Sequence, residues 1–204
     1  MSRIPLRAAF FDRHAPEVAV DLLGCLLVVE SSGHVASGRI VETEAYLGAD
    51  DSGSHAAMRG ITPRNAVMFG PPGVAYVYFT YGNHHMLNLV CEREGVAGAV
   101  LVRAIEPVEG IADMTSRRRG RALRELTNGP GKLTEALGID LTDNAVALGT
   151  GRITVYDGER PPSGAVGTSG RIGLSSGHEL QLRYFLTDCP FVSHGRTGPP
   201  PSAR

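Results

Sequence analysis

What the 204-residue sequence lacks narrows the choice of protein class before any motif is considered. There is no tryptophan, and no apolar run approaches the roughly 20 residues that a membrane-spanning helix needs. The first residues, MSRIPLRAAFFDRH, contain no apolar signal-peptide core. We therefore expect a cytosolic protein that has no membrane partner.

Cysteine and lysine are scarce as well. Cys25, Cys91 and Cys189 lie far apart in the sequence and form no CxxC pair. Such a set is typical of reduced thiols that fill small apolar sites, and it speaks against a zinc centre. Lys132 is the single lysine among 20 cationic residues, so almost all of the positive charge is arginine.

The charge is close to balanced but unevenly distributed. The formal net charge of −1 argues by itself against a nucleic-acid partner. The segment 116–133, SRRRGRALRELTNGPGKL, nevertheless holds six cations and one acid. A run of this kind is most often a solvated helix face, so its meaning depends on other residues.

The aromatic polar side chains are concentrated in one stretch. YVYFTYGNHH (76–85) contains three of the six tyrosines and two of the seven histidines. Gly82 and Asn83 predict a turn, and the flanking residues predict a β-hairpin with Tyr81 at its tip. Tyr76 and Tyr78 alternate along the first strand and share one of its faces.

Strand-like segments dominate the first half of the chain, and helical segments follow. Few βαβ signals are present, which favours an α+β fold: a single domain (1–204) with a curved, mostly antiparallel or mixed β-sheet, flanking helices and a protruding hairpin. We expect an ordered core over about 15–193 and a flexible tail over 196–204. The expected strands are 25–31, 38–47, 73–81, 86–92, 98–107, 151–158 and 178–188. The expected helices are a short one from near Pro16 to Gly24 and others around 108–126 and 130–138.

Strand 38–47 carries a candidate general base. Alternation places Glu42, Glu44 and Tyr46 on one face, opposite the smaller residues between them. A carboxylate that faces a partly enclosed pocket can accept a proton in catalysis, because burial and neighbouring charges shift its pKa. Spacing alone favours a solvent-facing edge or an ion pair with an arginine over this role for Glu44.

Other polar residues raise similar alternatives. Arg103 and Asn88 lie in apolar strands, and a buried guanidinium costs several kcal/mol unless it is paired, so Arg103 predicts a carboxylate, phosphate or site water nearby. His55 lies in the long connection 48–75, whose length is unusual unless it forms a binding loop. By themselves, His55 is typical of a surface residue and Tyr78 of a half-buried sheet tyrosine.

The segment TNGPGKL places backbone N–H groups and Lys132 at the start of a predicted helix. That arrangement suits a phosphate oxygen, although an ordinary helix cap is the commoner reading. The spacing of a Walker A loop is absent.

Several long motifs, taken together and in order, resemble one known family. They are RIVETEAYLG, DSGSHAAMRGITPRNAVMFGPPGVAYVYFTYG, HHMLNLVC, AVLVRAIEPVEG, LTNGPGKLTEALGI and RIGL. Over residues 15–193 the sequence resembles the alkyladenine (3-methyladenine, methylpurine) DNA glycosylases. Composition and spacing do not point to this family by themselves.

The resemblance implies roles for the residues of a base pocket. Glu44 matches the base that activates water, and Arg103 matches the arginine that holds this water and the target phosphate. Asn88 matches an amide on the pocket floor that discourages normal guanine. The residues that match the walls around the extruded base are Tyr46, His55 and Tyr78.

The resemblance also implies contacts with DNA. Tyr81 matches the ring that is inserted into the duplex where the nucleotide has left, and Arg64 and Lys132 match positions near the DNA backbone. Vertebrate members carry more apolar residues after the inserted ring. His84 and His85, which stand there in this chain, are therefore expected either to contact phosphate or to form an exposed turn.

The implied activity is base-excision repair of damaged purines. The enzyme would flip an alkylated base out of double-stranded DNA, hydrolyse its N-glycosidic bond and leave an abasic site, as a monomer of bacterial type that needs no metal or organic cofactor. Cleavage of the strand as well requires an amine nucleophile that forms a Schiff base. Because the single lysine, Lys132, lies in the predicted phosphate loop, we expect a monofunctional enzyme.

Two other functions are compatible with parts of this pattern. A hydrolase of nucleosides or single-stranded nucleic acid would use the same glutamate and rings without needing Tyr81. A catalytically silent protein that binds damaged DNA would not need Glu44. The sequence does not rank alkylated adenine, alkylated guanine, hypoxanthine and ethenoadenine as substrates.

Overall fold

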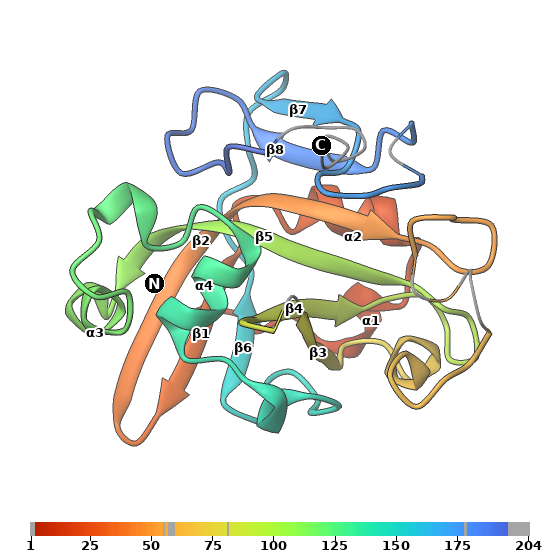
Figure 1. The fold of residues 1–204 in the computed structure, drawn as a ribbon, viewed down its shortest axis with the longest axis horizontal. Helices are drawn as coiled ribbons and strands as arrows, with labels where there is room; N and C mark the ends of the chain where they lie inside the picture. Colours follow the sequence, from red (N-terminus) through yellow and green to blue (C-terminus); the bar gives the residue numbers. More distant parts are fainter. Residues whose placement is uncertain (1–2, 55, 57–59, 81, 178, 196–204) are drawn as a thin grey trace.

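The computed structural model describes residues 3–54, 56, 60–80, 82–177 and 179–195. In these residues eight strands form one curled sheet in which every strand pair is antiparallel, so the expected α+β architecture is confirmed (Figure 1). The strands are Leu26–Ser31 (β1), His34–Tyr46 (β2), Ala75–Thr80 (β3), His84–Val90 (β4), Ala99–Glu109 (β5), Ile153–Tyr156 (β6), Val166–Ser169 (β7) and Arg183–Leu186 (β8).

The helices are short and pack against this sheet. In Figure 1, α2 lies behind β2, and α4 lies in front of the sheet, where it packs against β4 and β5. No helix among the described residues is long and apolar enough to cross a membrane. The helices are Ala8–Phe11 (α1), Ala15–Asp21 (α2), Ile111–Arg117 (α3) and Pro130–Leu137 (α4), with 3-10 turns at Ala66–Phe69 (η1), Leu123–Glu125 (η2) and Leu141–Asp143 (η3).

Strand β2 is the centre of the sheet. It pairs with β5 along one edge, and with β1 and then β8 along the other. The register between β2 and β5 shifts on both sides of Glu42. Bulges of this kind bend a strand and change where its side chains point. Residues 42–44 have β5 on one side and β8 on the other, and their three side chains are fully buried.

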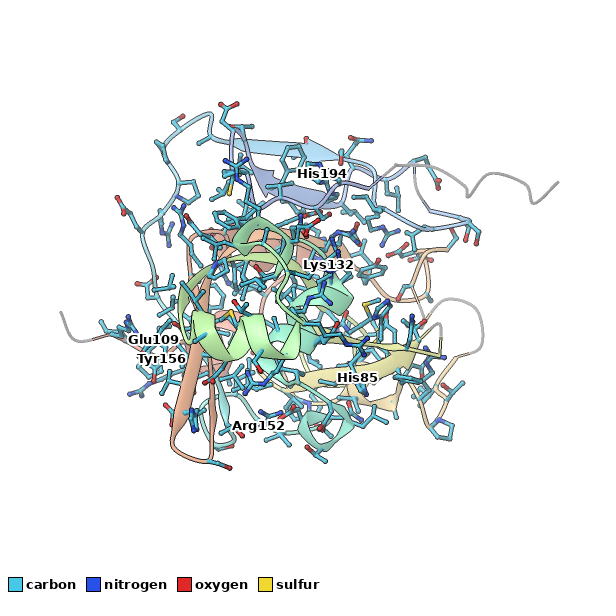
Figure 2. The ribbon with its side chains drawn as sticks, turned by 60° about the vertical axis from the view of Figure 1, so that its left-hand side comes forward. His85, Glu109, Lys132, Arg152, Tyr156 and His194 are labelled. Atoms are coloured by element: carbon cyan, nitrogen blue, oxygen red, sulfur yellow. The ribbon has the colours of Figure 1, made fainter. Side chains whose placement is uncertain are left out.

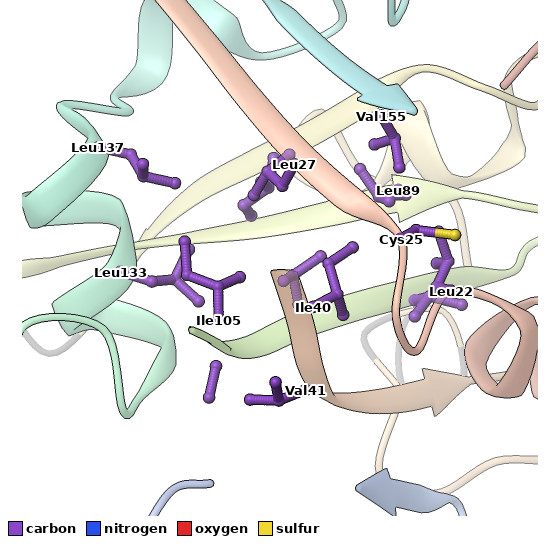
Figure 3. Close-up of a cluster of buried hydrophobic side chains, with 14 of the residues drawn as sticks. Leu22, Cys25, Leu27, Ile40, Val41, Leu89, Ile105, Leu133, Leu137 and Val155 are labelled. Carbon is purple, nitrogen blue, oxygen red and sulfur yellow. The ribbon is translucent and has the colours of Figure 1, made fainter. Parts of the chain in front are cut away.

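The two faces of the sheet have different surroundings. Val41 and Ala45 of β2 are fully buried in the main apolar core, which also contains side chains of α2 and α4. Figure 3 shows part of this core, with Val41 of β2 and Leu133 and Leu137 of α4. Cys25 and Cys91 belong to this core as free thiols, as expected. A second, smaller apolar cluster contains Tyr76, and the partly buried rings of Tyr46 and Tyr78 pack against it.

Some expected elements have different limits. The helix expected over 108–126 is wrong at both ends: β5 continues to Glu109, and α3 covers only Ile111–Arg117. The reason is pairing, because β2 begins at His34 rather than residue 38 and its extra length holds the end of β5 in the sheet. Strand β7 was not expected, since VGTS carries no clear alternation, and the strand expected over 178–188 is confined to β8. The tail 196–204 lies outside the described residues.

Candidate active site

A pocket of about 290 Å³ lies where β2, β3, β4 and β5 meet the connection after β7. Aromatic, apolar and polar side chains share its wall, which is the usual composition of a small-molecule site. The lining residues are Tyr46, Gly53, Met68, Tyr76, Tyr78, Thr80, Met86, Asn88, Leu101, Arg103, Pro130, Ile172, Gly173 and Leu174.

The Glu44 carboxylate lies directly behind this wall and is fully buried. Its Oε2 accepts a hydrogen bond from the Tyr46 hydroxyl at 2.8 Å, and its Oε1 accepts one from the backbone N–H of Ile172 at 2.7 Å. Arg103 Nη1 lies 3.2 Å from the same Oε1. Each group that holds the carboxylate also lines the pocket, so Glu44 is fixed in orientation at the pocket boundary.

Tyr46 is a protonated donor in this arrangement. Burial raises its pKa well above the usual tyrosine value, and the nearby Glu44 charge raises it further. The hydroxyl therefore keeps its proton and donates to the carboxylate.

The ring of Tyr46 is held in turn by a buried ion pair. The Arg171 guanidinium lies 4.6 Å from the ring centroid and forms hydrogen bonds to both oxygens of Asp51, one of them 2.6 Å long. Burial would raise the pKa of Asp51, but its bonds to Arg171 and to backbone N–H groups outweigh this and lower the pKa. The pair is ionised near neutral pH and fixes the loop after β2 against Tyr46.

Arg103 is held by a second carboxylate. Its Nε donates to Glu42 Oε1 at 2.8 Å, and Arg183 Nε donates to the same atom at 2.7 Å. Ser193 completes the cluster through its N–H and hydroxyl, which both donate to Glu42. Burial alone would lower the pKa of Arg103, but the charges of Glu44 and Glu42 outweigh it and raise the pKa. Arg103 thus bridges the two buried glutamates as a permanent cation.

Tyr76 and Tyr78 form the aromatic part of the wall. Their ring centroids are 5.2 Å apart and their planes are tilted by 39°. The Arg64 guanidinium lies 5.0 Å from the centroid of Tyr78. Burial raises the pKa of Tyr76 to about 12, against the opposing effect of Arg64. Arg64 is exposed at the side of the pocket, so its charge is close to the aromatic wall.

Asn88 has a defined orientation in the pocket. Its Nδ2 donates to the backbone carbonyl of Tyr76 at 3.1 Å, and the side chain is almost completely buried. A carbonyl oxygen only accepts hydrogen bonds, so the amide nitrogen must be the atom that faces Tyr76. A buried amide needs a hydrogen-bond partner, and the Tyr76 carbonyl is the partner of Asn88.

Comparison with known proteins gives a consistent assignment. Residues 9–190 match the family model described as methylpurine-DNA glycosylase (MPG). The chain belongs to the methylpurine-DNA glycosylase family. A relative from Chlorobaculum tepidum is 46% identical over 200 residues, covering 98% of this chain and 95% of its own, and carries the name "Putative 3-methyladenine DNA glycosylase". Relatives of the same name from Chlorobium luteolum (49% over 185 residues, 89% and 94% of the chains) and Bradyrhizobium diazoefficiens (47% over 189 residues, 93% and 90%) agree.

The structure of this methylpurine-DNA glycosylase family member brings together most of the residues that the sequence singled out. The pocket wall contains Tyr46, Tyr78, Asn88 and Arg103, and Glu44 lies behind it. An ion pair with an arginine was one of the alternatives to a catalytic role for Glu44. The structure shows such a pair with Arg103, and Glu44 nevertheless lies at the pocket boundary.

Two further predicted site residues, Arg64 and Lys132, are not among the residues that line the pocket. Lys132 lies on α4, outside the pocket lining, and its Nζ donates to Asn128 Oδ1 at 2.8 Å (Figure 2). Arg64 lies beside Tyr78 at the side of the pocket, and its contact with the DNA backbone stays a prediction, as does that of Lys132. His55 and Tyr81 lie outside the described residues, so their predicted roles remain predictions.

Sequence reasoning missed the residues that support the site. Arg171 and Ile172 come from the short motif RIGL, to which no role was assigned, and Asp51 comes from the long connection. Their contribution depends on contacts across more than 100 residues of sequence, which spacing does not encode. The sequence held one signal for Arg171: an arginine in a segment without clear periodicity, which could have been considered as a partner for a buried carboxylate. In the described part of the chain, no three His, Cys, Asp or Glu side chains converge as a possible metal site.

Proposed function

We propose that this chain hydrolyses the N-glycosidic bond of alkylated purines, with 3-methyladenine as the reference substrate, after the nucleotide has been flipped out of double-stranded DNA. The observation that carries the proposal is the buried Glu44 carboxylate, held by three groups that all line an aromatic pocket. Family membership and the shared name of the relatives supply the substrate class.

The pocket suits an extruded base. A base within a duplex cannot reach a buried carboxylate unless it leaves the stack, which costs a few kcal/mol. Stacking on an aromatic side chain returns about 1–3 kcal/mol per contact. Tyr46 and Tyr78 are the rings proposed to hold the base, with His55 as a further wall. A base that carries positive charge, as N-alkylated purines do, gains about 0.5–2 kcal/mol from a desolvated ring face.

The reaction proceeds at the sugar. A water oxygen attacks C1′ of the flipped nucleotide while Glu44 accepts one of its protons, and the base departs with the electron pair of the glycosidic bond. The Glu44 charge also stabilises the positive charge that develops on the sugar. Arg103, fixed by Glu42, orients the water and the adjacent phosphate. The products are a free modified base and an abasic site.

Asn88 is proposed to limit the substrate range. Its nitrogen is held by the Tyr76 carbonyl, so the position of its amide oxygen, the other polar atom of the side chain, is fixed at the pocket floor. Guanine carries an amino group that adenine lacks, and a rigid floor discriminates against an added group that it cannot accommodate. Normal guanine is thereby rejected.

The enzyme is monofunctional, in agreement with its family. The residues that line the pocket include no lysine, and the single lysine of the chain, Lys132, bonds to Asn128 instead. No lysine amine is therefore available at C1′ to form a Schiff base. Tyr81, between the ends of β3 and β4, is proposed to fill the gap left in the duplex.

Product analysis tests this function. Incubation with an alkylated duplex should release free 3-methyladenine and leave a strand that breaks only after treatment with alkali. Borohydride should trap no covalent complex. Failure to release any modified purine from duplex DNA would refute the proposal, and equal activity on free nucleosides would favour the nucleoside hydrolase instead.

A further inference from the structure

The ion pair of Arg171 and Asp51 lies behind the Tyr46 ring, on the side away from the pocket. Tyr46 lines the pocket, whereas neither Arg171 nor Asp51 does, and both charged side chains are fully buried. The Arg171 guanidinium lies 4.6 Å from the centroid of the Tyr46 ring. A cation therefore covers one face of this ring, while the extruded base would stack on the other.

The guanidinium is enclosed by the protein. Its Nη1 donates to the Ala45 carbonyl and its Nη2 to the Gly177 carbonyl, both at 3.0 Å. A Cβ on Gly53 or Gly177 would lie 2.6 or 2.8 Å from Nη2, so no water fits beside this atom. The Nε is buried and has no hydrogen-bond partner in the part of the chain that the structure describes. Asp51 is thus the group that neutralises Arg171 directly.

The buried charges that connect to Tyr46 cancel one another among the described residues. Three carboxylates face three guanidinium groups, namely Glu42, Glu44 and Asp51 with Arg103, Arg171 and Arg183. Arg64 adds a further cation beside Tyr78, but it is exposed, and water and salt screen exposed charges. A cationic base therefore meets buried surroundings without net charge as long as Asp51 is ionised.

We propose that Asp51 and Arg171 determine how well the pocket accepts a positively charged base, because Asp51 neutralises the cation behind Tyr46. The inference rests on the proposed function, which supplies an alkylated purine as the ligand of this ring. A base stacked on the free face of Tyr46 at van der Waals distance would lie roughly 8 Å from the guanidinium. At that distance Arg171 without its partner would repel a cationic base and oppose the attraction of the ring for it. Both residues act through Tyr46 and take no part in the chemical step.

Asp51→Asn removes the neutralising charge and keeps the shape of the side chain. The test uses two duplexes that carry either cationic 3-methyladenine or neutral ethenoadenine in a 2′-fluorinated nucleotide. Such nucleotides resist hydrolysis, because fluorine opposes positive charge on the sugar. The ratio of the two affinities, measured by fluorescence anisotropy, should shift about 5–20-fold against 3-methyladenine. Both affinities come from one preparation, so a partly unfolded fraction cancels in the ratio.

Two further variants separate charge from geometry. Arg171→Gln leaves Asp51 with the N–H donors of Leu47 and Gly53, each at 3.0 Å, and should shift the ratio the other way, in favour of 3-methyladenine. Each single variant thus tests the proposal if the other fails to fold. The double variant D51N/R171Q carries no charge behind the ring and should return to within a few-fold of the wild-type ratio.

The matched control is Asp143→Asn. Asp143 is 4% exposed and accepts hydrogen bonds from Arg152 at both carboxylate oxygens, and neither residue lines the pocket. This variant also loses a buried pair, and it should keep the wild-type affinity ratio whatever its stability.

An unchanged ratio in either single variant would overturn the assignment. So would equal shifts in Asp51→Asn and the double variant, because lost geometry rather than charge would then be responsible. A wild-type protein that binds neither lesion duplex better than an undamaged one would overturn it as well. The fluorinated duplexes undergo no turnover, so the expected ratios without base release from ordinary lesions would refute the proposed function alone.

Discussion

At the scale of single residues, the site combines full burial with ionised groups. Glu44 has no solvent exposure, yet both of its oxygens accept hydrogen bonds and Arg103 lies beside it. A buried charge is tolerated only when partners of this kind replace its hydration. Fixed donors around a carboxylate also reduce the reorganisation that a reaction would otherwise require. The same contacts that make burial possible also fix the orientation of the carboxylate, which the proposed proton transfer would require.

Tyr78 offers a test of the aromatic wall. If its ring stacks on the extruded base, Tyr78→Ala should weaken binding of a lesion-containing duplex by about 1–3 kcal/mol, or roughly 5–150-fold. Tyr78→Phe keeps the ring face and should bind within a few-fold of the wild type. Titration of both variants by fluorescence anisotropy makes the comparison. Equal losses in the two variants would indicate that the hydroxyl, rather than stacking, is responsible.

The residues that face the pocket could be predicted from the sequence, whereas their support could not. Alternation along β2 correctly put Glu42, Glu44 and Tyr46 on one face, because the period of a strand is a local property. The Arg171–Asp51 pair beneath Tyr46 joins segments 120 residues apart. No local pattern specifies which arginine will meet which carboxylate across that distance.

At the scale of elements, β2 is the strand on which the site depends. Glu42 of this strand joins β5 through Arg103, β8 through Arg183, and the segment after β8 through Ser193. Burial opposes ionisation of Glu42, but Arg103 and Arg183 outweigh it and lower its pKa. One carboxylate thus links three separate segments and holds Arg103 toward Glu44.

Glu42→Gln should be strongly destabilising for this reason. Removal of the charge leaves two buried guanidinium groups with one carboxylate fewer, and breaking a buried pair costs about 3–5 kcal/mol. Glu106→Gln is the matched control, because Glu106 pairs with Arg39 at 2.5 Å between the same strands but is one-third exposed, and it should cost less than about 1 kcal/mol. Urea unfolding of both variants measures the difference. Similar losses would show that the Glu42 cluster does not stabilise the fold beyond an ordinary surface pair.

Elements with strong alternation were predictable, and those defined by pairing were not. The hairpin of β3 and β4 follows from its apolar pattern and its Gly82–Asn83 turn. The end of β5 does not, because Pro107 and Glu109 read as the start of a helix and stay extended only through contact with β2. Tertiary pairing outweighs local propensity at such positions.

At the scale of the whole molecule, buried carboxylates determine the response to acid. The pKa values of Glu42 and Asp51 are lowered in the folded protein from ordinary values of 4.5 and 3.8. In acid the unfolded chain therefore binds more protons than the folded one. The stabilisation from these groups is complete above about pH 5 and is lost as the pH falls through their lowered folded values.

The free energy of unfolding should thus change little between about pH 6 and 8 on account of these groups and fall below about pH 4. Asp51→Asn should be less stable at neutral pH and show a shallower acid limb, because it has one such carboxylate fewer. Urea unfolding at a series of pH values measures both effects. A wild-type protein that gains stability on acidification from pH 5 to 3 would contradict the ionised state of the buried pairs.

The whole molecule also reconciles a nearly neutral chain with a DNA substrate. The net charge is −1, but Arg118, Arg119, Arg121 and Lys132 gather at one groove, which Glu125 and Glu135 also line. A local cluster of cations can attract phosphate even when the overall charge is close to zero. The net charge argued against a nucleic-acid partner because it sums the charges of the whole chain and does not show where cations gather on the surface.

The most direct test of the central claim is the single-turnover rate of 3-methyladenine release by Glu44→Gln with enzyme in excess over duplex. Glutamine keeps the shape of the side chain but cannot accept the proton of the attacking water. The rate should fall by about 10²–10⁴-fold, while the affinity for the same duplex stays within a few-fold of the wild type. Release by Glu44→Gln at the wild-type rate would contradict the assignment of Glu44 as the base.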